Sequence, residues 1–163
     1  MNYVPGDLIK NFKAKDFDFI AHQCNCHTIG GGISGVLIEN FPRVLEVHNL
    51  FINVFGRKDL YGKTALTDTT FGDIFNLYSQ YQPGACSNHK DSFEQRCAKL
   101  KECLTFINKE YPNRSIGLPL IASGIAADKK LKKDMSDLEY FGKYIAPIVE
   151  KCLPDMKVTI VYL

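Results

Sequence analysis

No stretch of this sequence approaches the roughly 18 consecutive apolar residues that a membrane-spanning helix requires. The first seven residues lack both the basic stretch and the apolar core of a secretory signal peptide. The sequence also has no internal repeat, no low-complexity segment and no linker-like stretch. We therefore expect a single domain that spans residues 1–163, lies in the cytoplasm and has no membrane partner.

An excess of charge of one sign is lacking as well, since the formal net charge at pH 7 is only +2. The densest group of basic residues has acidic neighbours, as is typical of a solvated loop or helix end. This group consists of Lys129, Lys130, Lys132 and Lys133, with Asp128 and Asp134 beside it. So weak a positive field predicts no duplex nucleic-acid partner.

Nothing in the sequence points to an oxidising compartment, although six cysteines are present. Cys97, Cys103 and Cys152 lie within helical patterns and are expected to be free, buried thiols. A zinc site is an alternative to consider for the other thiols and the imidazoles. The candidate ligands are His22, Cys24, Cys26, His27, Cys86 and His89. Their spacing matches no usual structural zinc pattern, so no metal is expected.

Strand patterns alternate with helical patterns along the chain. Strands are predicted over residues 2–4, 17–24, 65–70, 73–80, 115–121 and 157–163, and a hairpin joins 65–70 to 73–80. Helices are predicted over residues 35–40, 43–55, 91–111 and 137–152, although residues 50–55 could also be extended. This alternation predicts a layered α/β domain with helices on both faces of a mostly parallel sheet.

The two longest helical patterns begin with recognisable start signals. Asp91 and Glu94 stand at the spacing of a helix cap and its partner. Ser136 and Glu139 match the capping-box pattern ahead of residues 137–152. Ligands of parallel sheets bind beyond the carboxyl ends of the strands. The segments that follow residues 24 and 121 meet that description.

The first of these segments contains the glycine loop, which we define as residues 30–35, with the sequence GGGISG. Glycine lets the backbone approach a ligand closely, and several amides can then converge on an anion. The helix that follows adds its N-terminal amides and its dipole. The glycine loop therefore predicts a ligand that carries phosphate.

Two other interpretations of the glycine loop are weaker. Gly30, Gly32 and Gly35 match the G-x-G-x-x-G pattern of dinucleotide-binding folds. In those folds the pattern follows its strand at once, whereas several residues intervene here after Asn25, and Pro42 shortens the next helix. A nicotinamide-dependent dehydrogenase is therefore disfavoured. A tight turn without a ligand is also disfavoured, because three adjacent glycines cost backbone entropy.

The second segment, residues 118–128, leaves a buried strand and consists mostly of small residues. Ser123 can donate a hydrogen bond from its hydroxyl group, and Gly124 and its neighbours can donate hydrogen bonds from their backbone amides. Together with the glycine loop, this segment would hold a diphosphate from both sides. Alone, it could equally be a simple link from a strand to a helix.

Five segments occur in the order seen in macro domains, and the chain resembles that family over nearly its whole length. They are Gly6-Asp7-Leu8, His22-Gln23-Cys24-Asn25-Cys26, the glycine loop, Asn76-Leu77-Tyr78-Ser79-Gln80, and residues 118–125. The H-x-C-N-C stretch, the S-G-I loop and an ending like Val161-Tyr162-Leu163 resemble the ADP-ribose 1''-phosphate phosphatase branch of yeast and phages. The resemblance implies a three-layer α/β/α fold, ADP-ribose or its 1''-phosphate as ligand, and no cofactor.

The resemblance also implies roles for individual residues. Asp7 matches the acid that accepts a hydrogen bond from the adenine amino group, Asn25 matches a contact to the distal ribose, and Tyr162 matches a position near the adenine. A helix or turn cap is the alternative for Asp7, and an ordinary strand tyrosine is the alternative for Tyr162. The implied ligand-binding residues are Asp7, Leu8, Asn25, Gly30, Gly31, Gly32, Ile33, Ser123, Gly124, Ile125, Ala126 and Tyr162.

Removal of a terminal phosphate needs water, a proton acceptor or donor, and stabilisation of developing charge. The candidates for this chemistry are His22, Asn25, His27 and Asp128. His22 matches the histidine that the phosphatase branch places at this strand end, and its alternative is a hydrogen-bonded core histidine. His27 lies inside the loop, and Asp128 could act as a base.

Three functions are compatible with these residues. The expected one is hydrolysis of ADP-ribose 1''-phosphate to ADP-ribose and phosphate by a monomer. The alternatives are a hydrolase that acts on ADP-ribosylated macromolecules or O-acyl-ADP-ribose, and a reader that binds ADP-ribose without catalysis. The length and Gly/Pro content of residues 81–89 would also permit a lid over the site.

Overall fold

Six strands form one sheet in the computed structural model, which describes residues 1–87 and 91–163. The strands are β1 (Asn2–Pro5), β2 (Phe19–Asn25), β3 (Thr64–Asp68), β4 (Asp73–Gln80), β5 (Ser115–Leu118) and β6 (Lys157–Tyr162). Their order across the sheet is β1-β6-β5-β2-β4-β3, and every neighbouring pair is parallel except β3 and β4. The predicted hairpin is confirmed by the antiparallel β3–β4 pair.

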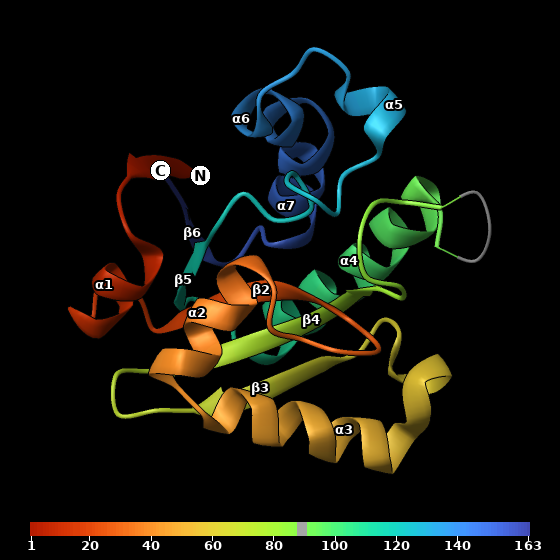
Figure 1. The fold of residues 1–163 in the computed structure, drawn as a ribbon. Helices are drawn as coiled ribbons and strands as arrows, with labels where there is room; N and C mark the ends of the chain where they lie inside the picture. Colours follow the sequence, from red (N-terminus) through yellow and green to blue (C-terminus); the bar gives the residue numbers. More distant parts are fainter. Residues whose placement is uncertain (88–90) are drawn as a thin grey trace.

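Helices cover both faces of this sheet (Figure 1). They are α1 (Leu8–Lys13), α2 (Gly32–Asn40), α3 (Arg43–Leu60), α4 (Phe93–Glu110), α5 (Lys129–Lys132), α6 (Asp137–Tyr140) and α7 (Ala146–Cys152). Buried side chains of α1, α2 and α3 pack on one face, and those of α4, α6 and α7 pack on the other. The expected three-layer α/β/α architecture with a mixed, mostly parallel sheet is confirmed.

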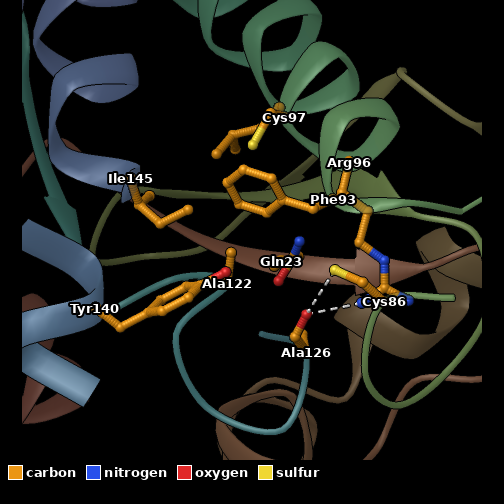
Figure 2. Close-up of a pocket in the computed structure, with 10 residues that line it drawn as sticks. Gln23, Cys86, Phe93, Arg96, Cys97, Ala122, Ala126, Tyr140 and Ile145 are labelled. Carbon is orange, nitrogen blue, oxygen red and sulfur yellow. Dashed lines mark hydrogen bonds between the residues drawn. The ribbon is translucent and has the colours of Figure 1, made fainter. Parts of the chain in front are cut away.

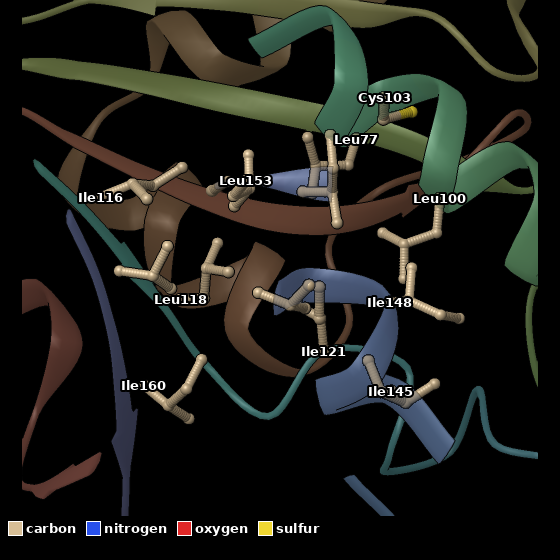
Figure 3. Close-up of a cluster of buried hydrophobic side chains, with 14 of the residues drawn as sticks. Leu77, Leu100, Cys103, Ile116, Leu118, Ile121, Ile145, Ile148, Leu153 and Ile160 are labelled. Carbon is tan, nitrogen blue, oxygen red and sulfur yellow. The ribbon is translucent and has the colours of Figure 1, made fainter. Parts of the chain in front are cut away.

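Successive side chains of a strand point to opposite faces of the sheet, which explains the two core layers. Phe19 and Ala21 of β2 face the α4 layer, whereas Ile20 between them faces the α1–α2 layer. Because both faces are covered, most residues of the central strands β2 and β4 are buried, polar ones included. Figure 3 shows the larger cluster, in which Leu77 of β4 and Leu100 of α4 lie in one layer.

The glycine loop and the helix after it overlap. Helix α2 begins at Gly32, earlier than the expected residue 35, so residues 32–35 of the glycine loop form the first helical turn. Residues 50–55 lie within α3 and are helical, so the extended alternative is wrong. Helix α3 is kinked at Gly56, whose φ of 74° is in the left-handed region that glycine tolerates.

Prolines explain two other departures from the predicted elements. Strand β5 ends at Leu118 because Pro119 has no amide hydrogen for the ladder. The helix predicted over residues 137–152 is divided into α6 and α7 by a π-helical turn, Phe141–Ile145. Pro147 cannot donate to the carbonyl four residues earlier, and the helix changes its hydrogen-bond register just before it.

The helix starts were predicted with mixed success. The capping box of Ser136 and Glu139 is confirmed. Helix α4, in contrast, is capped by Ser92, whose side chain and that of Gln95 form the box, and the expected cap at Asp91 is wrong. Asp91 is buried, and its carboxylate has other partners. No helix among residues 1–87 and 91–163 is both long enough and apolar enough to cross a membrane.

Candidate functional site

A cleft of about 590 Å³ opens at the carboxyl ends of β2, β4 and β5. Three loops line it, contributed by residues 23–34, 80–84 and 119–126, and Asp137 of α6 completes the rim. The sequence placed its ligand loops at the ends of β2 and β5, and both of these loops line this one cleft. Its size falls within the roughly 300–1,000 Å³ typical of small-molecule sites.

The glycine loop forms one wall of the cleft through Gly30, Gly31, Gly32 and Ile33. Gly32 has a φ of 54°, which is unfavourable for residues with a Cβ atom. A Cβ atom at Gly35 would lie 2.4 Å from the carbonyl oxygen of Gly30, so the loop folds back tightly onto α2. The first amides of α2 have no partner within the helix, and they lie beside this wall.

The loop after β5 forms the opposite wall, through Gly124, Ile125 and Ala126. Ile125 is 82% exposed at the rim. Ser123 does not line the cleft: it is fully buried, and its hydroxyl donates to the carbonyl of Ile121 at 3.0 Å. Ser123 therefore shapes the loop from below.

A buried ion pair that the sequence analysis missed joins two of the cleft loops. Arg96 of α4 donates to the carbonyl oxygens of Gly84, at 2.8 Å, and Ala126, at 2.9 Å, and both of these residues line the cleft. Its guanidinium pairs with Asp91 at 2.5 Å, and both side chains are less than 5% exposed. The signal in the sequence was an arginine on the apolar face of a helix, between Phe93 and Leu100.

Asp91 binds the start of the loop that contains Gly84. Its carboxylate accepts hydrogen bonds from the amides of Tyr81 and Gln82 and from the hydroxyl of Tyr61. Burial by itself would raise the pKa of Asp91, but the hydrogen bonds from Arg96 and from the two amides outweigh it and lower this pKa below its ordinary value. The carboxylate is therefore charged at neutral pH.

Figure 2 shows Arg96 and Cys86 beside Ala126, which lies in the loop after β5. The carbonyl oxygen of Ala126 accepts from Arg96 and lies 3.6 Å from the thiol of Cys86. Phe93, Tyr140 and Ile145 surround a small apolar space behind these groups. Arg96 thus joins the cleft wall to the hydrophobic core.

The histidines expected to do chemistry do not line the cleft. His22 is fully buried, with Nδ1 2.8 Å from the hydroxyl of Ser34 and Nε2 2.6 Å from the carbonyl oxygen of the Asn76 side chain. Burial lowers its pKa to about 4, so the ring is neutral at pH 7. His27 packs edge-on against Tyr81. Burial lowers its pKa as well.

Of the other two catalytic candidates, Asn25 lines the cleft and Asp128 does not. The side-chain oxygen of Asn25 accepts from the amides of His27 and Thr28, which fixes the turn before the glycine loop. Asp128 caps α5, where its carboxylate accepts from the amides of Lys130 and Leu131. Each side chain therefore has a local structural task.

The residues expected at the adenine end lie together at one edge of the sheet. Strands β1 and β6 are parallel neighbours, and the amide of Gly6 donates to the carbonyl of Tyr162 at 2.8 Å. Asp7 is exposed and caps α1 with two hydrogen bonds to its Oδ1 atom, whereas Leu8 is buried. None of these residues lines the cleft as its walls are defined above.

Asp137 is a cleft residue that the sequence analysis treated only as a helix start. Its carboxylate forms an ion pair with Lys132 at the rim. Cys24 also lines the cleft, but burial raises its thiol pKa well above the ordinary value, and the thiol stays protonated. Among residues 1–87 and 91–163, no three His, Cys, Asp or Glu side chains gather as a metal site; His89 lies outside this description.

Comparisons with known proteins identify relatives of this fold. No protein-family model matches the chain. An uncharacterized 17.5 kDa protein from the tk–vs intergenic region of Enterobacteria phage T4 is 33% identical over 136 residues, which cover 77% of this chain and 79% of that protein.

Solved structures are similar at lower sequence identity. The macrodomain of Mycobacterium tuberculosis DarG has a TM-score of 0.69 and 18% identity, over 98% of this chain and 95% of that one. Thermosipho africanus DarTG, solved in complex with ADP-ribose, has a TM-score of 0.66 and 16% identity, over 100% of this chain and 42% of that one. The chain therefore has the macrodomain fold and belongs to the same protein family as the 17.5 kDa protein of phage T4.

Proposed function

We propose that this chain binds ADP-ribose or ADP-ribose 1''-phosphate in the cleft between the glycine loop and residues 119–126. The observation that carries the proposal is the pair of glycine-containing loops on opposite walls, with the start of α2 beside one of them. Backbone amides in such loops suit a diphosphate. Thermosipho africanus DarTG has the same fold, and its structure contains ADP-ribose.

In the proposed arrangement the diphosphate lies between Gly31 and Gly124, and the distal ribose lies near Asn25. The adenine lies toward β1 and β6. Both capping hydrogen bonds of Asp7 use Oδ1, so Oδ2 can accept a hydrogen bond from the adenine amino group. Tyr162 is half-buried at the end of β6, where its ring can contact the base.

A charged side chain at Gly31 is expected to abolish this binding. Nothing lies within 4 Å of the position of a Cβ atom there, so Gly31→Glu fits the fold and places a carboxylate beside the proposed diphosphate. We expect calorimetric titration with ADP-ribose to show at least a hundredfold weaker binding, because like charges repel in a partly desolvated site.

Gly142→Glu is the matched control for this experiment. Gly142 is exposed, far along the chain in the π-helical turn, and also has open space at its Cβ position. The control is expected to bind as the wild-type protein does. Absence of both heat and a thermal shift with wild-type protein and ADP-ribose would contradict the proposal.

We further propose that the chain hydrolyses ADP-ribose 1''-phosphate. Water would attack phosphorus, the bond between phosphorus and the C1'' oxygen would break, and ADP-ribose would leave with a proton. Two features support this activity. Asp137 places a carboxylate at the rim of the cleft. His22 is linked to the cleft through its hydrogen bond with Ser34.

A reader without catalytic activity is the second candidate, because His22, His27 and Asp128 do not line the cleft. A panel of three substrates separates the candidates: ADP-ribose 1''-phosphate, an O-acyl-ADP-ribose and an ADP-ribosylated protein. We expect release of phosphate from the first, and a rate lowered at least tenfold in Asp137→Asn. Tight binding of ADP-ribose with no product from any of the three would identify a reader.

A further inference from the structure

A continuous chain of buried polar side chains runs from the cleft to the turn before the glycine loop. Ser34, in the first turn of α2, contacts Nδ1 of His22, and Nε2 of His22 contacts Asn76 of β4. The Asn76 amide contacts the hydroxyl of Tyr78 at 3.2 Å. That hydroxyl lies 2.9 Å from Nδ1 of His48, and Nε2 of His48 lies 3.3 Å from the carbonyl oxygen of His27.

The far end of this chain determines the direction of its hydrogen bonds. A backbone carbonyl can only accept, so Nε2 of His48 carries a proton and donates to His27. Burial lowers the pKa of His48, which makes the neutral ring the stable form at pH 7. Nδ1 of His48 therefore has no proton and accepts from the hydroxyl of Tyr78.

The hydrogen bonds between Tyr78 and the cleft have fixed directions as well. Because the Tyr78 proton is used, its oxygen accepts from the amide nitrogen of Asn76. The amide oxygen of Asn76 then accepts from Nε2 of His22. His22 is neutral, so its Nδ1 accepts the proton of Ser34. The backbone carbonyl of His27, earlier in the same loop segment, thus commits the single hydroxyl proton of Ser34 to the protein interior.

Ser34 lines the cleft, although the residue is only 7% exposed. Its oxygen can offer a ligand only lone pairs, since its proton is committed to His22. We propose that Ser34 is a specificity-determining residue that accepts a hydrogen bond from a sugar hydroxyl of the ligand. A phosphate oxygen gains no hydrogen bond from this hydroxyl, because it too can only accept. The inference deepens the proposed function and rests on it.

The tautomers of His22 and His48 test the directions of these hydrogen bonds in the wild-type protein without any ligand. Nitrogen-15 NMR of protein labelled in histidine distinguishes protonated from unprotonated ring nitrogens. We expect His22 and His48 both to carry their proton on Nε2 at pH 7. A proton on Nδ1 of His22 would make Ser34 a donor toward the cleft and would overturn the proposal.

Ligand binding by the Ser34→Ala variant tests the proposed hydrogen bond between Ser34 and a sugar hydroxyl of the ligand. We expect the dissociation constant for ADP-ribose to rise about tenfold, as for the loss of one hydrogen bond, while that for inorganic pyrophosphate stays unchanged. Thr67→Val is the control, because it also removes a buried hydroxyl but lies in β3, outside the cleft. It is expected to change neither constant.

The outcomes separate this inference from the proposed function. Equal weakening of ADP-ribose and pyrophosphate would mean that Ser34 donates to phosphate or merely supports the loop, and would overturn the inference. Unchanged affinity for ADP-ribose in Ser34→Ala would overturn it as well. If the wild-type protein binds neither probe, the proposed function itself falls, and the ligand contact at Ser34 falls with it.

Discussion

Replacing Asp91 by alanine is expected to lower the free energy of unfolding by about 3–5 kcal/mol, the usual cost of removing one partner from a buried ion pair. The carboxylate is 2% exposed, and the guanidinium of Arg96 that it neutralises is 4% exposed. The substitution also leaves the amides of Tyr81 and Gln82 without their acceptor. Urea denaturation of the two proteins measures the difference.

Asp68→Ala is the control for this prediction. Asp68 pairs with Arg43 at 3.4 Å, but the two side chains are 70% and 62% exposed, and such surface pairs contribute at most about 1 kcal/mol. If Asp91→Ala lowers the free energy of unfolding no more than Asp68→Ala does, the buried ion pair does not hold together the loops of residues 80–84 and 119–126. Because the pKa of Asp91 is lowered in the folded state, its contribution is present above the unfolded pKa and is lost as pH falls through the folded one.

Lowering the pH from 7 to 4 is expected to destabilise the native protein by about 3 kcal/mol through His22 alone. The folded pKa of His22 is about 4, against 6.5 for an unperturbed histidine, because burial disfavours the charged ring. The unfolded state therefore binds the proton more tightly. The contribution of His22 is complete above pH 6.5 and is lost as pH falls from 6.5 toward 4.

His22→Gln isolates this contribution, since a glutamine side chain does not titrate in this range. The wild-type protein should lose about 3 kcal/mol more than the variant when urea denaturation at pH 7 is compared with that at pH 4. Identical losses in the two proteins would show that His22 keeps an ordinary pKa when the protein is folded.

This second result also bears on catalysis. Because burial disfavours the charged ring of His22, this side chain accepts a proton only at a cost in free energy, and it is a weak base in this fold. Any contribution to phosphate release passes through Ser34, which is in contact with both His22 and the cleft. Asp137 reaches the cleft directly, and we therefore expect the substitution there to have the larger effect on the rate.

Much of the fold was predictable because its signals are local. Alternation of apolar residues and the Phe71-Gly72-Asp73 turn were sufficient for the β3–β4 hairpin. Short elements were less predictable: α1 has only six residues, too few for a helical period to stand out. The kink at Gly56 and the π-helical turn before Pro147 depend on exchanges of backbone hydrogen bonds that no sequence period records.

The sequence by itself determined the layered α/β class and the two loops that meet at the cleft, because hydrophobic period and glycine content act on neighbouring residues. Only the tertiary structure decided which polar side chains face the cleft. His22 and Ser34 are 12 residues apart, and Arg96 and Ala126 are 30 apart, so their contacts exist only after the strands pair and the helices pack. That packing buried the expected histidine and placed Ser34 and Asp137 on the cleft.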